Sequence, residues 1–293
     1  MDPSGDFRDF LKSRRARITP ERAGLTTYGK NRRVPGLRRE EVALLAGISA
    51  EYYVRLERGT VRGVSEDVLE GIARALQLDD AERTHLFDLA RASIASGRSR
   101  ASRRPAQERV RPAVQRILDS ITAPAFVVSA RSDLLAANTL GEALYADLYA
   151  DPERPVNTAR FIFLNPHAPE FFVDWDKVAD DSIGILRAQA GRDPHDRRLT
   201  DLIGELATRS DAFRVRWAAH DVRLHRTGTK QFHHRVVGDI TVEFESLDLP
   251  GDPGQRLVVY TAEPNSASQQ ALELLASWTT TPVPVSDGES IIT

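Results

Sequence analysis

The sequence of 293 residues contains no cysteine, a single methionine and no long apolar run. Without cysteine, disulfides, thiolate nucleophiles and cysteine-ligated zinc or iron–sulfur centres are excluded. Because about 18 consecutive apolar residues are needed to cross a bilayer, no segment is predicted to span a membrane. The first residues include Asp2, Asp6 and Asp9 and no apolar stretch, so we expect no secretory signal. A reducing cytoplasm is the expected location.

Familiar catalytic motifs are also missing. The sequence has no phosphate-binding glycine loop, dinucleotide fingerprint, G-x-S-x-G segment or paired-carboxylate motif. The histidines are weak metal candidates, because the adjacent His233 and His234 would point to opposite faces of a strand. His220 and His225 do not have the four-residue spacing that aligns two side chains on a helix. We therefore predict a protein that is not an enzyme and has no metal or cofactor.

Charge is divided unevenly along the chain. Residues 1–110 hold 22 Lys and Arg against 16 Asp and Glu, whereas the remainder holds 18 against 26. Only the front of the chain is therefore expected to meet phosphate. The length favours two domains. We predict a first domain over 1–92, a linker rich in Ser and Arg over 93–109, a second domain over 110–278 and a disordered tail over 279–293.

The stretch over residues 37–59, LRREEVALLAGISAEYYVRLERG, predicts two short helices joined by a tight turn. Gly47 ends the first helix, over 38–46, because glycine accepts a left-handed backbone conformation. Ser49 is a good N-cap for the second helix, over 50–58. Two helices joined in this way form a helix-turn-helix, whose second member fits the major groove of DNA.

The faces of these helices divide by polarity. Inward positions are predicted at Val42, Leu45, Ala46, Tyr53 and Leu56. Candidate DNA contacts lie at the start of the pair and on the outer face of the second helix: Arg38, Arg39, Ser49, Ala50, Glu51, Tyr52, Arg55 and Arg58. The preceding loop over 18–37 carries Lys30, Arg32 and Arg33, which are expected on the phosphate backbone or in a minor groove. A solvated charged loop is the alternative.

The same stretch resembles a known group of bacterial regulators. Ala43, Gly47, the Ile48–Ser49 step and the exit LERG are similar to the helix-turn-helix of the xenobiotic-response-element (XRE) type. The longer run VPGLRREEVALLAGIS, followed by EYY and RLERG, resembles the MmyB-like branch of that group. This resemblance implies an all-α N-terminal domain of five helices, with the other three expected over 6–17, from Ser65 to Leu76 and over 80–92.

The second domain is predicted to mix helices and strands. A helix is expected over 112–118 and paired strands over 124–130 and 132–138, and a helical, aromatic-rich middle follows. Period-two patterns then predict three strands: 230–236, 239–246 and 256–262. Five strands with helices between the second and third are the order of a PAS-like domain. The fold class is therefore α+β, with a PAS-like antiparallel sheet and helical cover after the all-α domain.

The MmyB-like resemblance implies a small apolar ligand, fatty-acid-like or of another apolar kind, between the sheet and its helices. Aromatic residues expected to line that space are Phe126, Phe172, Trp175, Phe232 and Phe244, with Trp217 and His220 near the mouth and His220 or Arg223 at a carboxylate head. An ordinary aromatic core is the alternative. Relatives often have Trp at the positions of Ser132 and Ala137, so we expect a reshaped pocket here.

Three hypotheses follow from these features. The first is a ligand-responsive, sequence-specific regulator that binds double-stranded operator DNA as a homodimer. The second is an acyl-ligand carrier or enzyme with a vestigial helix-turn-helix, against which the intact basic motif counts. The third is an adaptor whose helical domain binds protein. A DNA-binding protein whose second domain only dimerises is a variant of the first.

Overall fold

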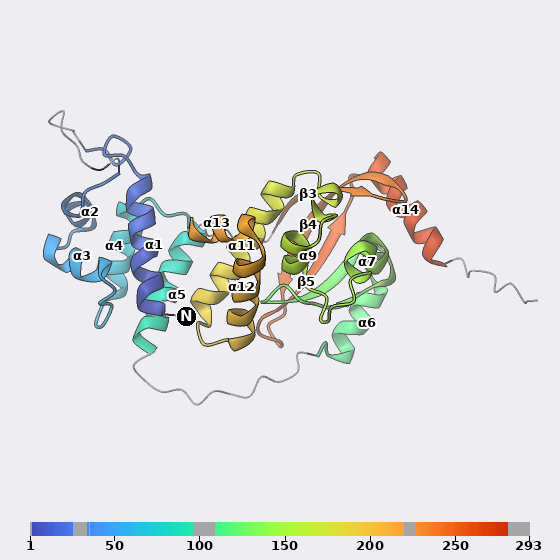
Figure 1. Ribbon diagram of the computed structural model, residues 1–293, viewed down its shortest axis with the longest axis horizontal. Helices are drawn as coiled ribbons and strands as arrows, with labels where there is room; N and C mark the ends of the chain where they lie inside the picture. The colour runs from blue at the N-terminus through green and yellow to red at the C-terminus, as the bar shows by residue number, and fades with distance from the viewer. Residues whose placement is uncertain (1, 26–33, 35, 96–108, 220–226, 281–293) are drawn as a thin grey trace, which may run out of the picture.

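The computed structural model describes residues 2–25, 34, 36–95, 109–219 and 227–280. Its N-terminal part is helical, and its C-terminal part places helices around a five-stranded sheet (Figure 1). This arrangement confirms the predicted α+β class. Within the described residues, no helix combines the length and the apolar character needed to cross a membrane.

Five helices build the N-terminal part: α1 (Pro3–Arg17), α2 (Arg39–Ala46), α3 (Ala50–Glu57), α4 (Glu66–Ala75) and α5 (Asp80–Ala95). Side-chain oxygens of Asp2, Ser49 and Ser65 cap α1, α3 and α4, because each accepts a hydrogen bond from a backbone N–H of the first turn. Gly47 ends α2 at a φ of 69°. The predicted helices are confirmed, although α5 continues through three residues that the sequence assigned to the linker.

The inward face of α2 differs from the prediction. Val42 and Ala43 are buried, whereas Leu45 is 36% exposed and Ala46 is half-buried. At about 100° per residue, positions 42, 43 and 46 fall on one arc of the helix and Leu45 falls at its margin. Small residues are favoured on this arc because α4 approaches closely: a Cβ atom added to Gly71 would lie 2.6 Å from the carbonyl oxygen of Ala46.

The C-terminal part contains one antiparallel sheet. Its strands are β1 (Ala125–Ser129), β2 (Leu134–Ala137), β3 (Thr227–His234), β4 (Gly238–Asp248) and β5 (Gln255–Thr261), in the order β2-β1-β5-β4-β3. All five predicted strands are present. The strand predicted over 230–236 ends two residues earlier, because β3 stops at His234 and a turn follows, and Val236 is 46% exposed.

Helices cover both faces of the sheet. Those between β2 and β3 are α7 (Thr139–Leu144), α8 (Ala146–Tyr149), α9 (Thr158–Leu164), α10 (Ala168–Phe171), α11 (Trp175–Arg192), α12 (Arg197–Arg209) and α13 (Asp211–Ala218). On the opposite face, α6 (Pro112–Ser120) packs Val114 and Leu118 against Val127 and Leu257. Each face of the sheet forms a hydrophobic core with the helices that pack on it.

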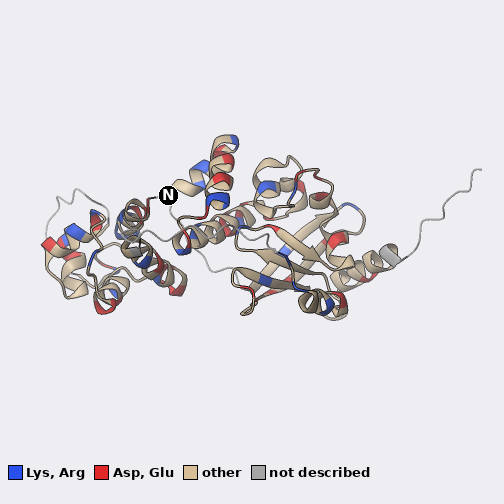
Figure 2. Cartoon of the chain, turned by 90° about the horizontal axis from the view of Figure 1, so that it is seen from below, with Lys and Arg blue, Asp and Glu red and all other residues tan. Residues whose placement is uncertain are grey.

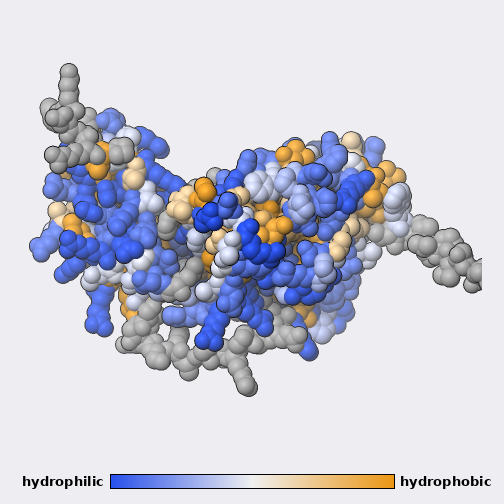
Figure 3. Space-filling model, in the orientation of Figure 1, coloured by the Kyte–Doolittle hydropathy of each residue, from blue (hydrophilic) through white to orange (hydrophobic). Residues whose placement is uncertain are grey.

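A final helix, α14 (Ala267–Thr280), was not predicted from the sequence. It buries Ala271, Leu272 and Leu275 against the domain and leaves Leu274 and Trp278 exposed. On the face shown in Figure 3, apolar side chains gather mainly on the C-terminal domain. Most of the predicted tail, residues 281–293, lies outside the described residues.

Candidate nucleic-acid interface and internal cavity

The inner side of α3 is fixed to its neighbours by packing and by ion pairs. Tyr53 and Leu56 are buried, as predicted, and Glu57 is only 1% exposed. Its carboxylate accepts a 2.6 Å hydrogen bond from Nε of Arg15 on α1 and another from Nε of Arg39 on α2. Charge-assisted hydrogen bonds of this kind are stronger than neutral ones. The last turn of α3 is therefore held to two other helices.

The outer side of α3 faces solvent. The exposed candidates on or beside it are Ser49, Ala50, Glu51, Arg55 and Arg58. Tyr52 is half-buried, and the Arg55 guanidinium carbon lies 5.0 Å from the centroid of its ring. This helix therefore presents donors and acceptors at a surface whose opposite side is immobilised, as a helix that enters a DNA groove requires.

The two arginines at the start of α2 have different environments. Arg38 is exposed, and its backbone N–H donates to Glu41 in a capping interaction. Arg39 is half exposed and uses its Nε to bind Glu57, and this hydrogen bond raises the pKa of the Arg39 guanidinium. Arg39 thus has a bracing role in addition to any contact with DNA. Lys30, Arg32 and Arg33 lie outside the described residues.

Acidic and basic residues alternate along the N-terminal helices. Figure 2 shows residues of both signs interspersed along the ribbon there and in the C-terminal domain. The excess of positive charge in residues 1–110 comes partly from arginines and a lysine outside the described residues. Contacts to bases would therefore depend on particular side chains of α3 rather than on a continuous field.

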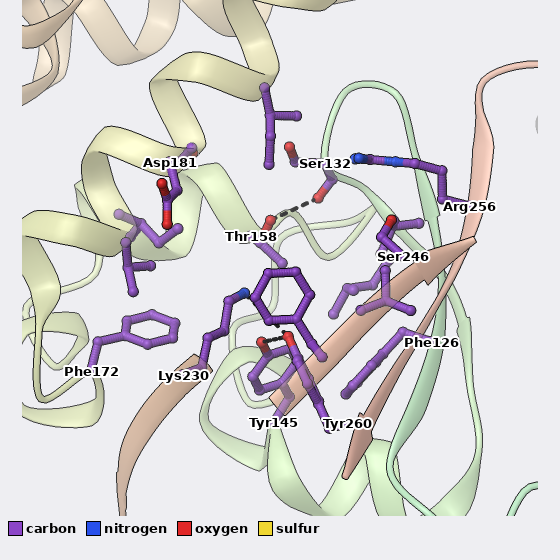
Figure 4. Close-up of a pocket in the computed structure, with 18 residues that line it drawn as sticks. Phe126, Ser132, Tyr145, Thr158, Phe172, Asp181, Lys230, Ser246, Arg256 and Tyr260 are labelled. Carbon is purple, nitrogen blue, oxygen red and sulfur yellow. Dashed lines mark hydrogen bonds between the residues drawn. The ribbon is translucent and has the colours of Figure 1, made fainter. Parts of the chain in front are cut away.

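A cavity of about 80 Å³ lies between the sheet and its helical cover (Figure 4). Its apolar lining includes Phe126, Val128, Phe172, Phe244 and Val258. Polar side chains also reach it: Ser132, Tyr145, Thr158, Asp181, Ser182, Lys230, Ser246 and Arg256, with Tyr260. The cavity is therefore amphipathic rather than purely apolar.

A cation and two phenols form one polar group in this cavity. Tyr145 and Tyr260 share a 2.7 Å hydrogen bond between their hydroxyls, and Nζ of Lys230 donates to Tyr260 over 3.2 Å (Figure 4). The same Nζ lies 5.2 Å from the ring centroid of Phe244, within the range of a cation–π interaction. Burial, and then the neighbouring Tyr260, raises the pKa of Tyr145 well above its usual value. Tyr145 therefore stays protonated at neutral pH.

Two hydroxyls in the cavity wall lack hydrogen-bond partners within the part of the chain that the structure describes. They belong to Ser182 on α11, which is 4% exposed, and Ser246 on β4. A buried hydroxyl without a partner costs about 1–3 kcal/mol. A ligand with a polar group next to its apolar part would satisfy at least one of them.

The predicted lining is partly reproduced. Phe126, Phe172 and Phe244 line the cavity. Phe232 is fully buried and packs beside Phe172, with ring centroids 5.7 Å apart, but it does not face the cavity.

Trp175 was predicted in the lining and Trp217 near the mouth, and neither is among the residues that line the cavity. Trp175 donates its indole N–H to the carbonyl of Ile162. Trp217 stacks on Phe213. Both rings pack against helices of the cover, which explains why neither reaches the cavity. His220 and Arg223 lie outside the described residues.

Sequence analysis missed Lys230, Tyr145 and Tyr260 as cavity residues. A signal was present for Lys230, because it stands two positions before Phe232 on a strand and therefore shares its face. A charged residue on an inward face is unusual enough to mark a site. For Tyr145 no such signal exists, since a helical cover of many aromatic residues does not show which ring points toward the sheet.

The strand histidines do not form a metal site. His233 is exposed and pairs with Asp239 over 2.6 Å, whereas the buried His234 lies 3.2 Å from the carbonyl oxygen of Ala143. They point to opposite faces, as the strand period predicts. Across the described ranges, no cluster of three or more His, Asp or Glu could hold a metal ion.

Comparison with protein families identifies both parts of the chain. Residues 6–86 match the model of a helix-turn-helix domain, and residues 110–275 match that of the MmyB-like transcription regulator ligand binding domain. No curated protein matches the sequence. The second match spans more than half of the chain and contains the whole sheet and cavity. The chain therefore belongs to the MmyB-like transcription regulators, with a helix-turn-helix domain for DNA and a second domain for a ligand.

Proposed function

We propose that this protein reads operator DNA in a sequence-specific manner through α3 and that a small amphipathic ligand in the cavity controls this binding. The observation that supports DNA reading is the exposed outer face of α3, which is backed by the buried Glu57 and its two arginine partners. Because paired helix-turn-helix domains read two half-sites, we propose a homodimer as the binding form. The cytoplasm is the proposed location, and no catalytic activity is proposed.

Direct measurement of DNA affinity tests the first part. Fluorescence anisotropy would compare DNA from upstream of the chain's own coding sequence with a shuffled duplex of equal length and composition, at a fixed salt concentration. A specific regulator should bind the upstream DNA at least about 10³-fold more tightly. Equal affinities for the two duplexes would reject sequence-specific reading and favour the alternatives, a carrier or an adaptor with a vestigial motif.

The chemistry of the cavity supports a ligand class. A volume of about 80 Å³ holds roughly five to eight water-sized units, at about 10–15 Å³ each. A short fatty-acid-like molecule suits this space, with its chain along Phe126 and Phe172 and its carboxylate at Lys230. The hydroxyls of Ser182 and Ser246, which have no hydrogen-bond partner among the residues that the structure describes, also favour an amphipathic ligand over a hydrocarbon.

A length series would measure the ligand class by calorimetry. Straight-chain carboxylates from butanoate to dodecanoate would be compared with alcohols of equal length. Each buried CH₂ should contribute about 0.8 kcal/mol until the cavity is filled. Lys230→Met should weaken carboxylates and leave alcohols nearly unchanged, whereas Lys177→Met, at an exposed lysine of α11, is the matched control. If no member of either series binds, the second domain is better described as a dimerisation module.

A further inference from the structure

Helix α11 has two different sets of neighbours along its length. Its first three turns line the cavity with Val178, Asp181, Ser182 and Ile185. Its last two turns contact the N-terminal helices, and in Figure 1 α11 and α13 lie between those helices and the sheet. One continuous helix therefore forms both a wall of the ligand cavity and part of the interface between the two domains.

The contact between α11 and α5 is close and specific. A Cβ atom added to Gly191 would lie 2.7 Å from Cε1 of His85, a distance that side chains do not tolerate. Beside it, Nε of Arg192 binds a carboxylate oxygen of Asp88 over 3.3 Å. One turn earlier, Ala188 packs against the apolar core of the N-terminal domain. Movement of this end of α11 would therefore displace α5 or break these contacts.

A second group of contacts ties the same interface to α1. The buried Arg187 lies 4.1 Å from the ring centroid of Trp217 and donates to the carbonyl oxygen of that residue. Burial raises the pKa of Asp6 on α1, and the charge of Arg187 partly opposes this increase. Nη2 of Arg17, at the end of α1, donates to the carbonyl oxygen of Ala219 over 3.3 Å. Helices α1 and α5 of the N-terminal domain are thus both in contact with α11 or with the end of α13.

The path from the cavity to the interface is short. Ile185 and Gly191 lie on one uninterrupted helix, separated by about 9 Å at 1.5 Å per residue. Packed helices shift as units rather than deform gradually. From α1, Arg15 reaches Glu57 at the end of α3. Cavity wall, interface and DNA-facing helix are therefore joined by direct contacts.

We propose that α11 is the coupling element of this protein: filling the cavity displaces α11, and its contacts with His85 and Asp88 transmit that displacement to the helix-turn-helix. This inference rests on the proposed function, because it assigns the regulation of the same cavity. The position of α11 supports it, because this helix supplies four of the residues that line the cavity, Val178, Asp181, Ser182 and Ile185.

Matched glycine substitutions test the proposal in the full chain. Gly191→Ala places a methyl group against His85, whereas Gly204→Ala makes the same change on α12 where nothing lies within 4 Å of the added Cβ. The DNA affinity of each variant would be measured with and without saturating octanoate. We expect octanoate to change the DNA affinity of the unmodified chain and of Gly204→Ala by the same factor, within about 5–150-fold. In Gly191→Ala this factor should fall several-fold, while octanoate affinity is retained.

Charge reversal supplies an independent pair of variants if Gly191→Ala does not fold. Arg192→Glu opposes Asp88 across the interface, whereas Arg209→Glu reverses a comparably exposed arginine on α12. Only the first should reduce the effect of octanoate on DNA affinity. The coupling role of α11 would be overturned if octanoate changed the DNA affinity of the interface variants by the same factor as that of the unmodified chain. It would also be overturned if octanoate bound the unmodified chain without altering its DNA affinity.

A different readout separates failure of the ligand class from failure of the coupling. If octanoate does not bind, the cavity can be altered from its own wall by Ser182→Leu, which fills it, or by Ile185→Ala, which enlarges it. Hydrogen exchange would then be followed at the amides of α5. Several-fold altered exchange there supports coupling through α11 even though the proposed ligand class is wrong. Exchange in α5 identical to that of the unmodified chain would reject the coupling.

Discussion

Arg15 and Glu57, which are 42 residues apart in the sequence, form a 2.6 Å ion pair that ties α1 to the last turn of α3. The carboxylate is 1% exposed, and Arg15 and Arg39 each bind one of its oxygens. A buried charge is tolerated only where it is paired in this way. The position of α3, the helix that we propose reads DNA, therefore depends in part on this acidic residue.

Removing that carboxylate should destabilise the N-terminal domain. We expect Glu57→Ala to lower the free energy of unfolding by about 2–4 kcal/mol, because two arginines lose their partner in a largely buried site. Urea denaturation followed by circular dichroism would measure it. Glu51→Ala, an exposed position on the same helix, should change stability by less than about 0.5 kcal/mol. Equal effects of the two substitutions would contradict the bracing role.

Arg55 and Arg39 should affect DNA binding by different routes. Arg55→Ala removes an exposed group and should cost about 1–3 kcal/mol of DNA affinity with no loss of stability. Arg39→Ala should lose DNA affinity and also about 1 kcal/mol of stability, because it binds Glu57 from a half-exposed position. Anisotropy and thermal unfolding on the same samples would separate the two effects. Arg116→Ala, at an exposed position on α6, is the control and should change neither quantity.

Two helical glycines should respond oppositely to alanine. Gly71→Ala brings a methyl group to 2.6 Å from the backbone oxygen of Ala46, so α2 and α4 must separate. We expect Gly71→Ala to lower the free energy of unfolding by about 1–3 kcal/mol, despite the better helix propensity of alanine. In Gly204→Ala no atom lies within 4 Å of the added Cβ, so the free energy of unfolding should rise by up to about 1 kcal/mol. Differential scanning calorimetry would check the signs, and a stabilised Gly71→Ala would disprove the close approach.

The cations before the motif should act on phosphate alone. Replacing Lys30, Arg32 and Arg33 with alanine should weaken binding to all DNA sequences alike. It should also reduce the slope of log affinity against log salt concentration by roughly two to three units. An altered sequence preference would instead place these residues in a groove. An unchanged slope would leave them as a solvated charged loop.

Much of this fold could be predicted from local sequence patterns. Caps such as Ser49, the stop at Gly47 and the period-two run of Ile240, Val242 and Phe244 determine their elements through neighbouring residues alone. Helix α14 was missed, because its short polar start resembles a loop and it is fixed by the burial of Leu272 and Leu275 against distant elements.

The cavity was harder to predict than the elements around it. Its aromatic residues were identifiable as inward-facing, but whether a ring lines a void or fills the core depends on packing between elements far apart in sequence. Phe244 and Phe232 have similar strand patterns, yet only Phe244 faces the cavity. The Glu57 carboxylate was missed for the same reason, since its partners lie on two other helices.

The close packing of Gly191 on His85 also limits how freely the two halves of this chain can be exchanged with those of other proteins. In sequence they are separate modules, but in the folded protein the side of α5 near Leu89 is covered by α11. A fragment that ends after α5 would leave that side uncovered. Grafting this sensor onto another helix-turn-helix would therefore require that the new partner provide a matching surface for the end of α11.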